Sequence, residues 1–272
     1  MSIKIQLRGV SQVFPVRSAD GLRQEAFTAI DAIDLDVRSG EFLTIVGPSG
    51  CGKSTLLDLI GGLTRPSAGE LFLDGQRITG AALDRGIVFQ QYALLPWYTA
   101  LQNTAFGLEV KGVPKTRRLA TAREYLALVG LAEFADRYPH ELSGGMRQRV
   151  AIARSLAHDP EVLLMDEPFA ALDAQTRESL QTELLRIWQQ SGKTIVFITH
   201  GLDEAVYLGQ RVVVMRARPG RIRAVVDVPL HDRLAARDLR SSAPFAAIRH
   251  QVWEALHGDI DQPQARVASV AA

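Results

Sequence analysis

The sequence has little of what marks several large classes of protein. It holds one cysteine, Cys51, among 272 residues, so no disulfide can form within the chain, which is typical of a reducing compartment. No run approaches 18 apolar residues, and no membrane-spanning helix is predicted. The first residues, MSIKIQLRGV, lack the apolar core of a secretory signal. The net charge is +1, without the basic bias of nucleic-acid binders, so nucleic acid is not an expected partner.

The chain has enough apolar residues for a folded core. Hydrophobic residues make up 47% of it and charged residues 22%, close to globular averages. Short apolar or alternating segments predict β-strands. The expected strands are IKIQLRGVSQVF (3–14), AIDAIDLDV (29–37), EFLTIV (41–46), GELFLDG (69–75), RGIVFQ (85–90), EVLLMDEP (161–168), TIVFITH (194–200) and RVVVMRA (211–217).

Helical patterns separate several of these strands. KSTLLDLIGGL (53–63) predicts a helix that ends at its two glycines, and RESLQTELLRIWQQ (177–190) predicts an amphipathic one. Between about 92 and 158 strand signals vanish and helical spacing takes over, which indicates an inserted helical subdomain. Strands alternating with helices predict an α/β fold with a mainly parallel sheet, whose ligands bind at the carboxyl ends of the strands.

The tail, residues 231–272, is less informative than the main domain, residues 1–230. Four apolar residues at helical spacing predict one face of a final helix. They are Phe245, Ile248, Val252 and Leu256.

The segment GPSGCGKST, from Gly47 to Thr55, fits G-x-x-x-x-G-K-[ST] between an expected strand and an expected helix. The glycines let the backbone wrap phosphate oxygens, Lys53 reaches the β- and γ-phosphates, and Ser54 offers a hydroxyl to Mg²⁺. The alternative is an ordinary glycine-rich turn. Cys51 only has to be small and is assigned no chemistry. The residues expected at the nucleotide are Gly47, Pro48, Ser49, Gly50, Cys51, Gly52, Lys53, Ser54 and Thr55.

Two acids end the buried strand VLLMDEP. Asp166 is expected to hold Mg²⁺ through water, and Glu167 to act as general base on the attacking water. Neighbouring residues of a strand point to opposite faces, so two roles are reasonable. The alternative is a solvated acidic turn. Gln90 and His200 also end expected strands, where each is either functional or simply a polar terminus.

A second anion site is predicted at HELSGGMRQRVAIARSL (140–156), where a glycine-rich turn opens a helix. A helix start directs backbone N–H groups and the positive end of the dipole at an anion. One chain therefore carries two phosphate-binding patterns about ninety residues apart.

Together these residues resemble the nucleotide-binding subunits of ATP-binding-cassette transporters. The resemblance covers about residues 1–230 and implies a P-loop NTPase fold: a mainly parallel sheet, an antiparallel β edge and an inserted helical subdomain. It implies ATP hydrolysis with ATP and Mg²⁺. The shared motifs, in the family's order, are the P-loop, VFQ (88–90), LSGGM (142–146), LLMDEP (163–168), ALD (171–173) and ITH (198–200).

The resemblance explains the two phosphate sites. Subunits of this family pair head to tail, with each ATP between the P-loop of one and the glycine-rich segment of the other. Ser143, Gly144 and Gly145 would then bind the γ-phosphate of the partner's ATP. Two half-sites on one chain imply a symmetric homodimer with two complete sites.

Four roles come from the resemblance alone. Gln90 would coordinate Mg²⁺ and sense the membrane partner, and Asp173 would cross the dimer interface. His200 would contact the γ-phosphate and orient the water or Glu167. The expected catalytic residues are therefore Glu167, His200 and Lys53. Phe14 would stack on adenine, unless it is an ordinary strand residue.

The chain departs from the family's motifs at two positions. Met146 stands where glutamine is usual, which removes one polar contact but leaves the phosphate-facing residues. Ala170 stands where serine is common.

The segment QYALLPWYTALQNTAFGLEVKG (91–112) and RPGRI (218–222) resemble the nitrate, taurine and aliphatic-sulfonate importers, the taurine type most closely. The resemblance implies a membrane permease as partner, a solute-binding protein as indirect partner, and a peripheral place on the cytoplasmic face of the inner membrane. Taurine or another sulfonate is the first expectation for the solute and nitrate the second. Trp97 is expected near the groove that receives the permease, or else in the core of the helical subdomain.

Three alternatives to an importer remain. A cassette ATPase of DNA repair or translation usually has a long coiled coil after Gln90 or two cassettes. A regulatory protein with a dead cassette would not need every catalytic position filled. Exporter cassettes are commonly fused to their membrane domain.

Overall fold

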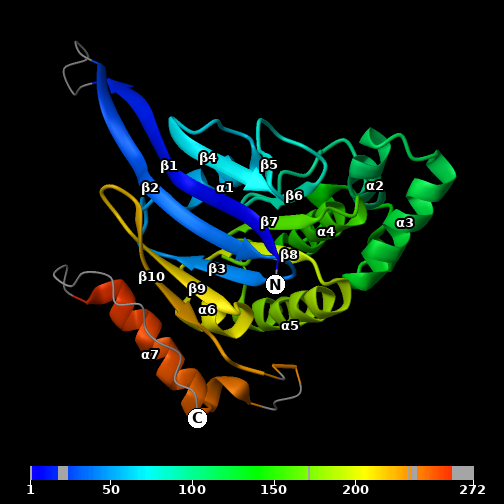
Figure 1. Ribbon diagram of the computed structural model, residues 1–272. Coiled ribbons are helices and arrows are strands. Elements are labelled where there is room, and N and C mark those ends of the chain that lie inside the picture. Colours follow the sequence, from blue (N-terminus) through cyan, green and yellow to red (C-terminus); the bar gives the residue numbers. More distant parts are fainter. Residues whose placement is uncertain (1, 18–23, 171, 232, 235–237, 259–272) are drawn as a thin grey trace.

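The computed structural model describes residues 2–17, 24–170, 172–231, 233–234 and 238–258. Within them two sheets form the framework (Figure 1). The larger, six-stranded sheet has the order β10–β9–β3–β8–β7–β6, parallel except for β10. Its strands are β3 (Phe42–Val46), β6 (Arg85–Val88), β7 (Val162–Asp166), β8 (Thr194–Ile198), β9 (Arg211–Arg216) and β10 (Arg221–Asp227).

The central strands are apolar throughout because both faces of this sheet are covered. In β8, Ile195 and Phe197 pack on one face, while Val196 and Ile198 pack on the other. Such continuous apolar runs are typical of parallel strands with helices on both sides.

The four-stranded sheet is antiparallel, with the order β2–β1–β4–β5. Its strands are β1 (Ile3–Arg17), β2 (Gln24–Arg38), β4 (Ala68–Leu73) and β5 (Gln76–Arg77). The first two strands are longer than expected because their ladder continues to the pair Arg17 and Gln24. The register shifts at four places along it. At the last of these, Gln12 pairs with Ile30 but Val13 pairs with Thr28, so Ala29 is an extra residue.

Helix α1 (Lys53–Gly61) lies between the two sheets, and its leucines share one core with residues of both. It ends as expected, because Gly62 adopts the left-handed conformation that caps a helix. The opposite face of the larger sheet is covered by α5 (Ala174–Ser191), α6 (Leu202–Leu208) and α7 (Ala243–His257).

Helix α7 carries the apolar face predicted for the tail. Phe245, Ile248 and Val252 are buried, and α7 packs against β9 and β10. A short 3₁₀ turn, Leu239–Ser241, precedes it and brings Arg240 beside α5 and α6.

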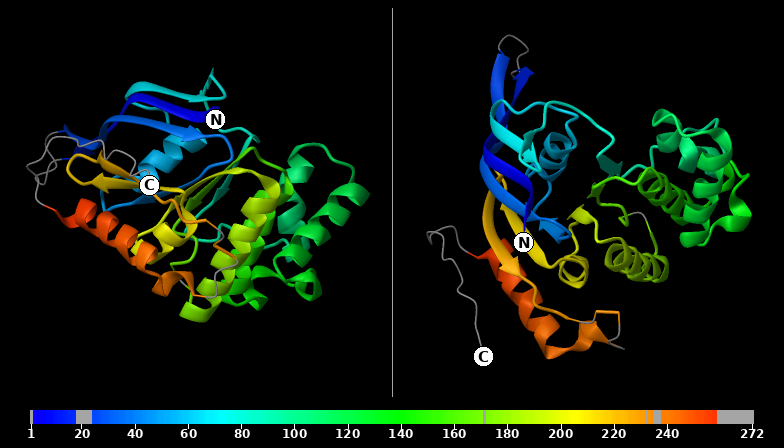
Figure 2. Two further views of the ribbon diagram at one scale, coloured as in Figure 1. Left: turned by 60° about the horizontal axis from the view of Figure 1, so that its bottom comes forward. Right: turned by 45° about the vertical axis from the view of Figure 1, so that its right-hand side comes forward.

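The helical subdomain lies to one side of both sheets (Figure 2). It contains α2 (Ala100–Val110), α3 (Lys115–Leu128) and α4 (Gly144–Ala157), with 3₁₀ turns Ala132–Phe134 and Pro139–Glu141. The three helices enclose a small core of their own. All residues from 92 to 158 are described and none is in a strand.

Among the described residues no helix combines the length and the apolarity needed to cross a bilayer.

Candidate nucleotide site

Three loops meet at the carboxyl edge of the larger sheet because β3, β8 and β7 are neighbours. The register places Ile45, Ile198 and Asp166 in one row across these strands. The backbone N–H of Thr199 donates to Ile45 O at 3.1 Å, and that of Glu167 donates to Ile198 O at 3.0 Å. The P-loop, the Glu167 turn and the His200 turn therefore start side by side, as ligand sites in such sheets do.

The P-loop follows β3 and depends on its glycines. Gly52 has φ +89°, and a Cβ there would lie 2.4 Å from Cγ2 of Ile30 on β2. Gly220, in the β9–β10 turn, approaches the loop equally closely, since a Cβ added there would lie 2.2 Å from Cys51 O. Its N–H donates to Ala29 O at 3.0 Å. Two distant segments thus clamp the loop.

Lys53 is buried at the first position of α1. Its Nζ donates to Gly47 O at 2.9 Å and to Pro48 O at 3.2 Å, so the ammonium is held across the inside of the loop. Gly52, the N-cap of α1, has no side chain to satisfy the first N–H groups of the helix. Free N–H groups beside an ammonium suit phosphate oxygens. Cys51 is buried, and burial raises the pKa of its thiol, which fits a packing role.

The three residues expected around Mg²⁺ come from adjacent places. Burial raises the pKa of Asp166, and the nearby Ser54 hydroxyl acts in the opposite direction, so the two side chains lie close together. Gln90 is exposed just after β6, the neighbour of β7. Hydroxyl, carboxylate and amide oxygens are the hard ligands that Mg²⁺ prefers, so this donor set fits the ion.

Glu167 lies outside β7, which corrects the expectation that both acids belong to the strand. It has φ +43°, the left-handed region, so a turn rather than strand alternation separates its side chain from Asp166. Its Oε2 lies 3.2 Å from Nδ1 of His200, which is 68% exposed. A carboxylate paired with an exposed imidazole can hold and orient a water molecule.

The glycine-rich segment begins α4, as predicted. Ser143 is the N-cap, and its Oγ accepts from the Met146 N–H at 3.3 Å. A Cβ on Gly144 or Gly145 would meet Tyr92 Oη at 3.0 Å or Thr176 Cγ2 at 3.1 Å, so neither neighbour belongs to the P-loop.

Asp173 caps α5 in the same way, accepting from the Thr176 N–H at 2.9 Å, and this bond lowers the pKa of Asp173. Of its motif, Ala171 lies outside the described residues.

Phe14 is partly exposed on β1, directly opposite Phe27 of β2. Directly paired residues share one face of a sheet, so both aromatic residues lie on the same face there. Phe27 was not expected from the sequence, because the register that places it opposite Phe14 depends on shifts in the β1–β2 ladder, including the one at Ala29. Trp97 is 66% exposed, so its alternative place in the core is wrong.

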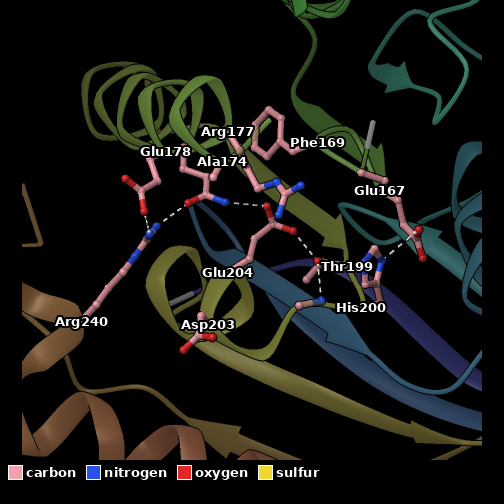
Figure 3. A pocket seen from close by; sticks show the side chains of 13 residues that line it. Glu167, Phe169, Ala174, Arg177, Glu178, Thr199, His200, Asp203, Glu204 and Arg240 are labelled. Carbon is pink, nitrogen blue, oxygen red and sulfur yellow. Dashed lines mark hydrogen bonds and ion pairs between the residues drawn. The ribbon is translucent and has the colours of Figure 1, made fainter. Parts of the chain in front are cut away.

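A cavity of about 190 Å³ adjoins the Glu167–His200 pair (Figure 3). Its walls come from α5, α6, the His200 turn and Arg240. The sequence predicted neither the cavity nor the hydrogen bonds between the polar side chains that line it, because these residues are far apart in the sequence.

Comparisons with known proteins agree with this geometry. The family model described as ABC transporter matches residues 30–170. The chain is 51% identical over 260 residues, 96% of its own length and 94% of the other's, to an uncharacterized ABC transporter ATP-binding protein of Methanocaldococcus jannaschii.

Two relatives have more specific descriptions. A taurine import ATP-binding protein of Roseobacter denitrificans is 46% identical, covering 87% of this chain and 86% of the relative. A nitrate import ATP-binding protein of Synechocystis is 51% identical, covering 76% and 78%. Among solved structures, a dimeric ATP-binding cassette bound to ADP and phosphate matches with a TM-score of 0.74 and 33% identity, covering 83% of this chain and 99% of that one.

Proposed function

The chain belongs to the ATP-binding-cassette transporter family and is an ATPase of an importer type, and on that premise we propose that it drives uptake of a small sulfonate such as taurine. Nitrate is the second candidate. Both solutes are suggested by relatives, a taurine and a nitrate import protein, that match most of the chain. The partners in this proposal are a second copy of the chain, a membrane permease and, indirectly, a solute-binding protein. The place of action is the cytoplasmic face of the cell membrane.

The observation that carries the chemistry is the Glu167–His200 pair beside the P-loop. Lys53 and the first N–H groups of α1 hold the phosphates of ATP and stabilise charge on the transferring phosphoryl group. Glu167 accepts a proton from the attacking water, and His200 fixes the orientation of its carboxylate. Ser54, Gln90 and Asp166 would hold Mg²⁺, which when bound neutralises phosphate charge.

The proposed dimer follows from the separation of the two phosphate-binding segments. Side chains added to the glycines of the α4 segment would meet Tyr92 and Thr176 rather than the P-loop. A second chain related by two-fold symmetry can present Ser143, Gly144 and Gly145 to that loop, with Asp173 at the interface. A matched solved cassette is likewise described as dimeric. Phe14, with Phe27 beside it, would stack on the adenine.

The test is ATPase activity in liposomes that hold this chain with its co-purifying permease. Taurine, an alkanesulfonate or nitrate is added, each with its binding protein. Stimulation by a sulfonate supports the proposal, and stimulation by nitrate alone favours the second candidate. Steady activity that ignores all three solutes would refute both. The Glu167→Gln chain is the control for contaminating ATPases.

A further inference from the structure

The position of His200 depends on its backbone turn. Its imidazole is 68% exposed, and its side-chain hydrogen bond runs to Glu167. The turn is fixed by Thr199, a residue only 2% exposed. The Thr199 hydroxyl accepts from the Gly201 N–H at 3.0 Å and donates to Oε2 of Glu204 on α6. The Thr199 hydroxyl thus links the residues on either side of His200, and its bond to Glu204 fixes the direction of the hydroxyl.

Glu204 is held in turn by Gln181 of α5. Gln181 Nε2 donates to Oε1 of Glu204 at 2.7 Å, and Gln181 Oε1 accepts from the Arg240 guanidinium. A carboxylate only accepts and a guanidinium only donates, so the amide has one possible orientation. Gln181 is 2% exposed, which excludes competing water.

Arg240 belongs to the segment after the last strand, yet it is fixed to the domain in three ways. It donates to Oε1 of Glu178 at 2.7 Å (Figure 3), it binds Gln181, and its guanidinium lies 4.6 Å from the centre of the Tyr207 ring. A planar guanidinium can make all three contacts at once, whereas a lysine ammonium would keep the positive charge but lose the planar, forked arrangement of N–H donors.

We propose that Arg240 and Gln181 are positioning residues that act through Glu204 and Thr199 to hold His200 against Glu167. The tail would then set the rate of ATP hydrolysis without touching the nucleotide. The inference rests on the proposed role of His200. Losing either residue should lower kcat about 3- to 30-fold, the range found for coupled networks, and should leave KM for ATP within about twofold.

The experiment compares ATPase kinetics of the full-length chain and its variants. Arg240→Ala and Gln181→Leu should both slow kcat. Gln181→Glu keeps a partner for Arg240 but faces Glu204 with a like charge, so it should slow kcat as well. Arg240→Lys should recover only part of the loss. The matched control is Arg249→Ala, since Arg249 lies on α7 and approaches Asp203 of the same helix α6 at 3.9 Å, outside this chain of contacts.

Two further measurements separate positioning from general destabilisation. In a His200→Ala background, Arg240→Ala should have no additional effect on kcat, because the residue it positions is gone. In chains with labelled histidine, the NMR signals of the His200 ring should shift in Arg240→Ala and Gln181→Glu, but not in Arg249→Ala. Unshifted signals, or equal slowing in the two backgrounds, would overturn the inference.

Failure of the proposed function would look different. If His200→Ala hydrolyses ATP at the rate of the unmodified chain, His200 has no catalytic role and both proposals fall. If His200→Ala is slow while Arg240→Ala and Gln181→Leu retain full kcat, only the positioning inference fails.

Discussion

Nδ1 of His200 lies 3.2 Å from Oε2 of Glu167, although 33 residues separate them in the sequence. Adjacent parallel strands produce this contact, because β7 ends just before Glu167 and β8 just before the His200 turn. In the proposed mechanism, the pair joins a proton acceptor, Glu167, to His200, which fixes the direction of its carboxylate.

The first prediction concerns Glu167. Glu167→Gln keeps the shape and the left-handed turn but removes the basic oxygen, so ATP hydrolysis should fall about 10²- to 10⁴-fold. ATP binding should persist, as equilibrium dialysis with labelled ATP can measure. Glu161→Gln is the control, because Glu161 pairs with Lys4 at the other end of the same strand. Normal turnover in Glu167→Gln would exclude Glu167 as the base.

The second prediction concerns Lys53. Lys53→Ala removes a charged donor at the phosphates, so ATP affinity should fall about 10- to 100-fold in titration calorimetry. Lys193→Ala is a matched control: Lys193 Nζ also binds a backbone carbonyl, Pro160 O at 2.8 Å, but at the start of β8. Equal losses from the two variants would argue against a specific role for Lys53.

The third prediction compares two glycines of one loop. Gly50 and Gly52 both have positive φ, +74° and +89°, but only Gly52 faces a neighbour within reach of a Cβ. Gly50→Ala should therefore cost about 1–2 kcal/mol of unfolding free energy, the price of a left-handed alanine. Gly52→Ala adds a clash worth about 1–3 kcal/mol more. Urea denaturation measures both, and equal costs would contradict the steric argument.

The fourth prediction separates two roles of Ser143. Ser143→Ala removes the cap of α4 and should cost about 1 kcal/mol of stability. Ser143→Asp restores the cap and places a favourable negative charge at the helix start. That charge would repel a phosphate, so the more stable variant should be the less active ATPase. Thr99→Asp, at the cap of α2, is the control and should leave activity intact. An active Ser143→Asp chain would place the phosphate elsewhere.

Local pattern predicted much of the fold. The strands of the larger sheet were recognisable because both faces are buried, and α1 ends where Gly61 and Gly62 predict. Strand ends were less certain: β6 stops at Val88, two residues before Gln90, because its pairing with β7 ends there. β1 and β2 run beyond the expected residues because the pairing of two strands, rather than apolar content, extends them.

The residues of the candidate site also divide into those that local sequence motifs predict and those that only the tertiary structure brings together. Lys53, Asp166 and Glu167 are carried by short motifs, and the order of the strands places them together. Gln181 and Arg240 belong to no local pattern, because their contact joins positions 59 residues apart. An amide inside an amphipathic helix looks like any polar residue until its partners are known.

The clamp on the P-loop by Ile30 and Gly220 has a consequence for how the molecule opens. Ile30 belongs to the antiparallel sheet, Gly220 to a turn of the larger sheet, and both are within a methyl group's reach of the loop. The P-loop therefore cannot change conformation without separating the antiparallel sheet from the larger sheet. We expect the slowly exchanging amide hydrogens of β2 and β3 to exchange in one cooperative event, and ATP to slow that event in both sheets together. Native-state hydrogen exchange would detect separate events if the layers open independently. Bound ATP would then stabilise the contact between the two sheets in addition to supplying energy by its hydrolysis.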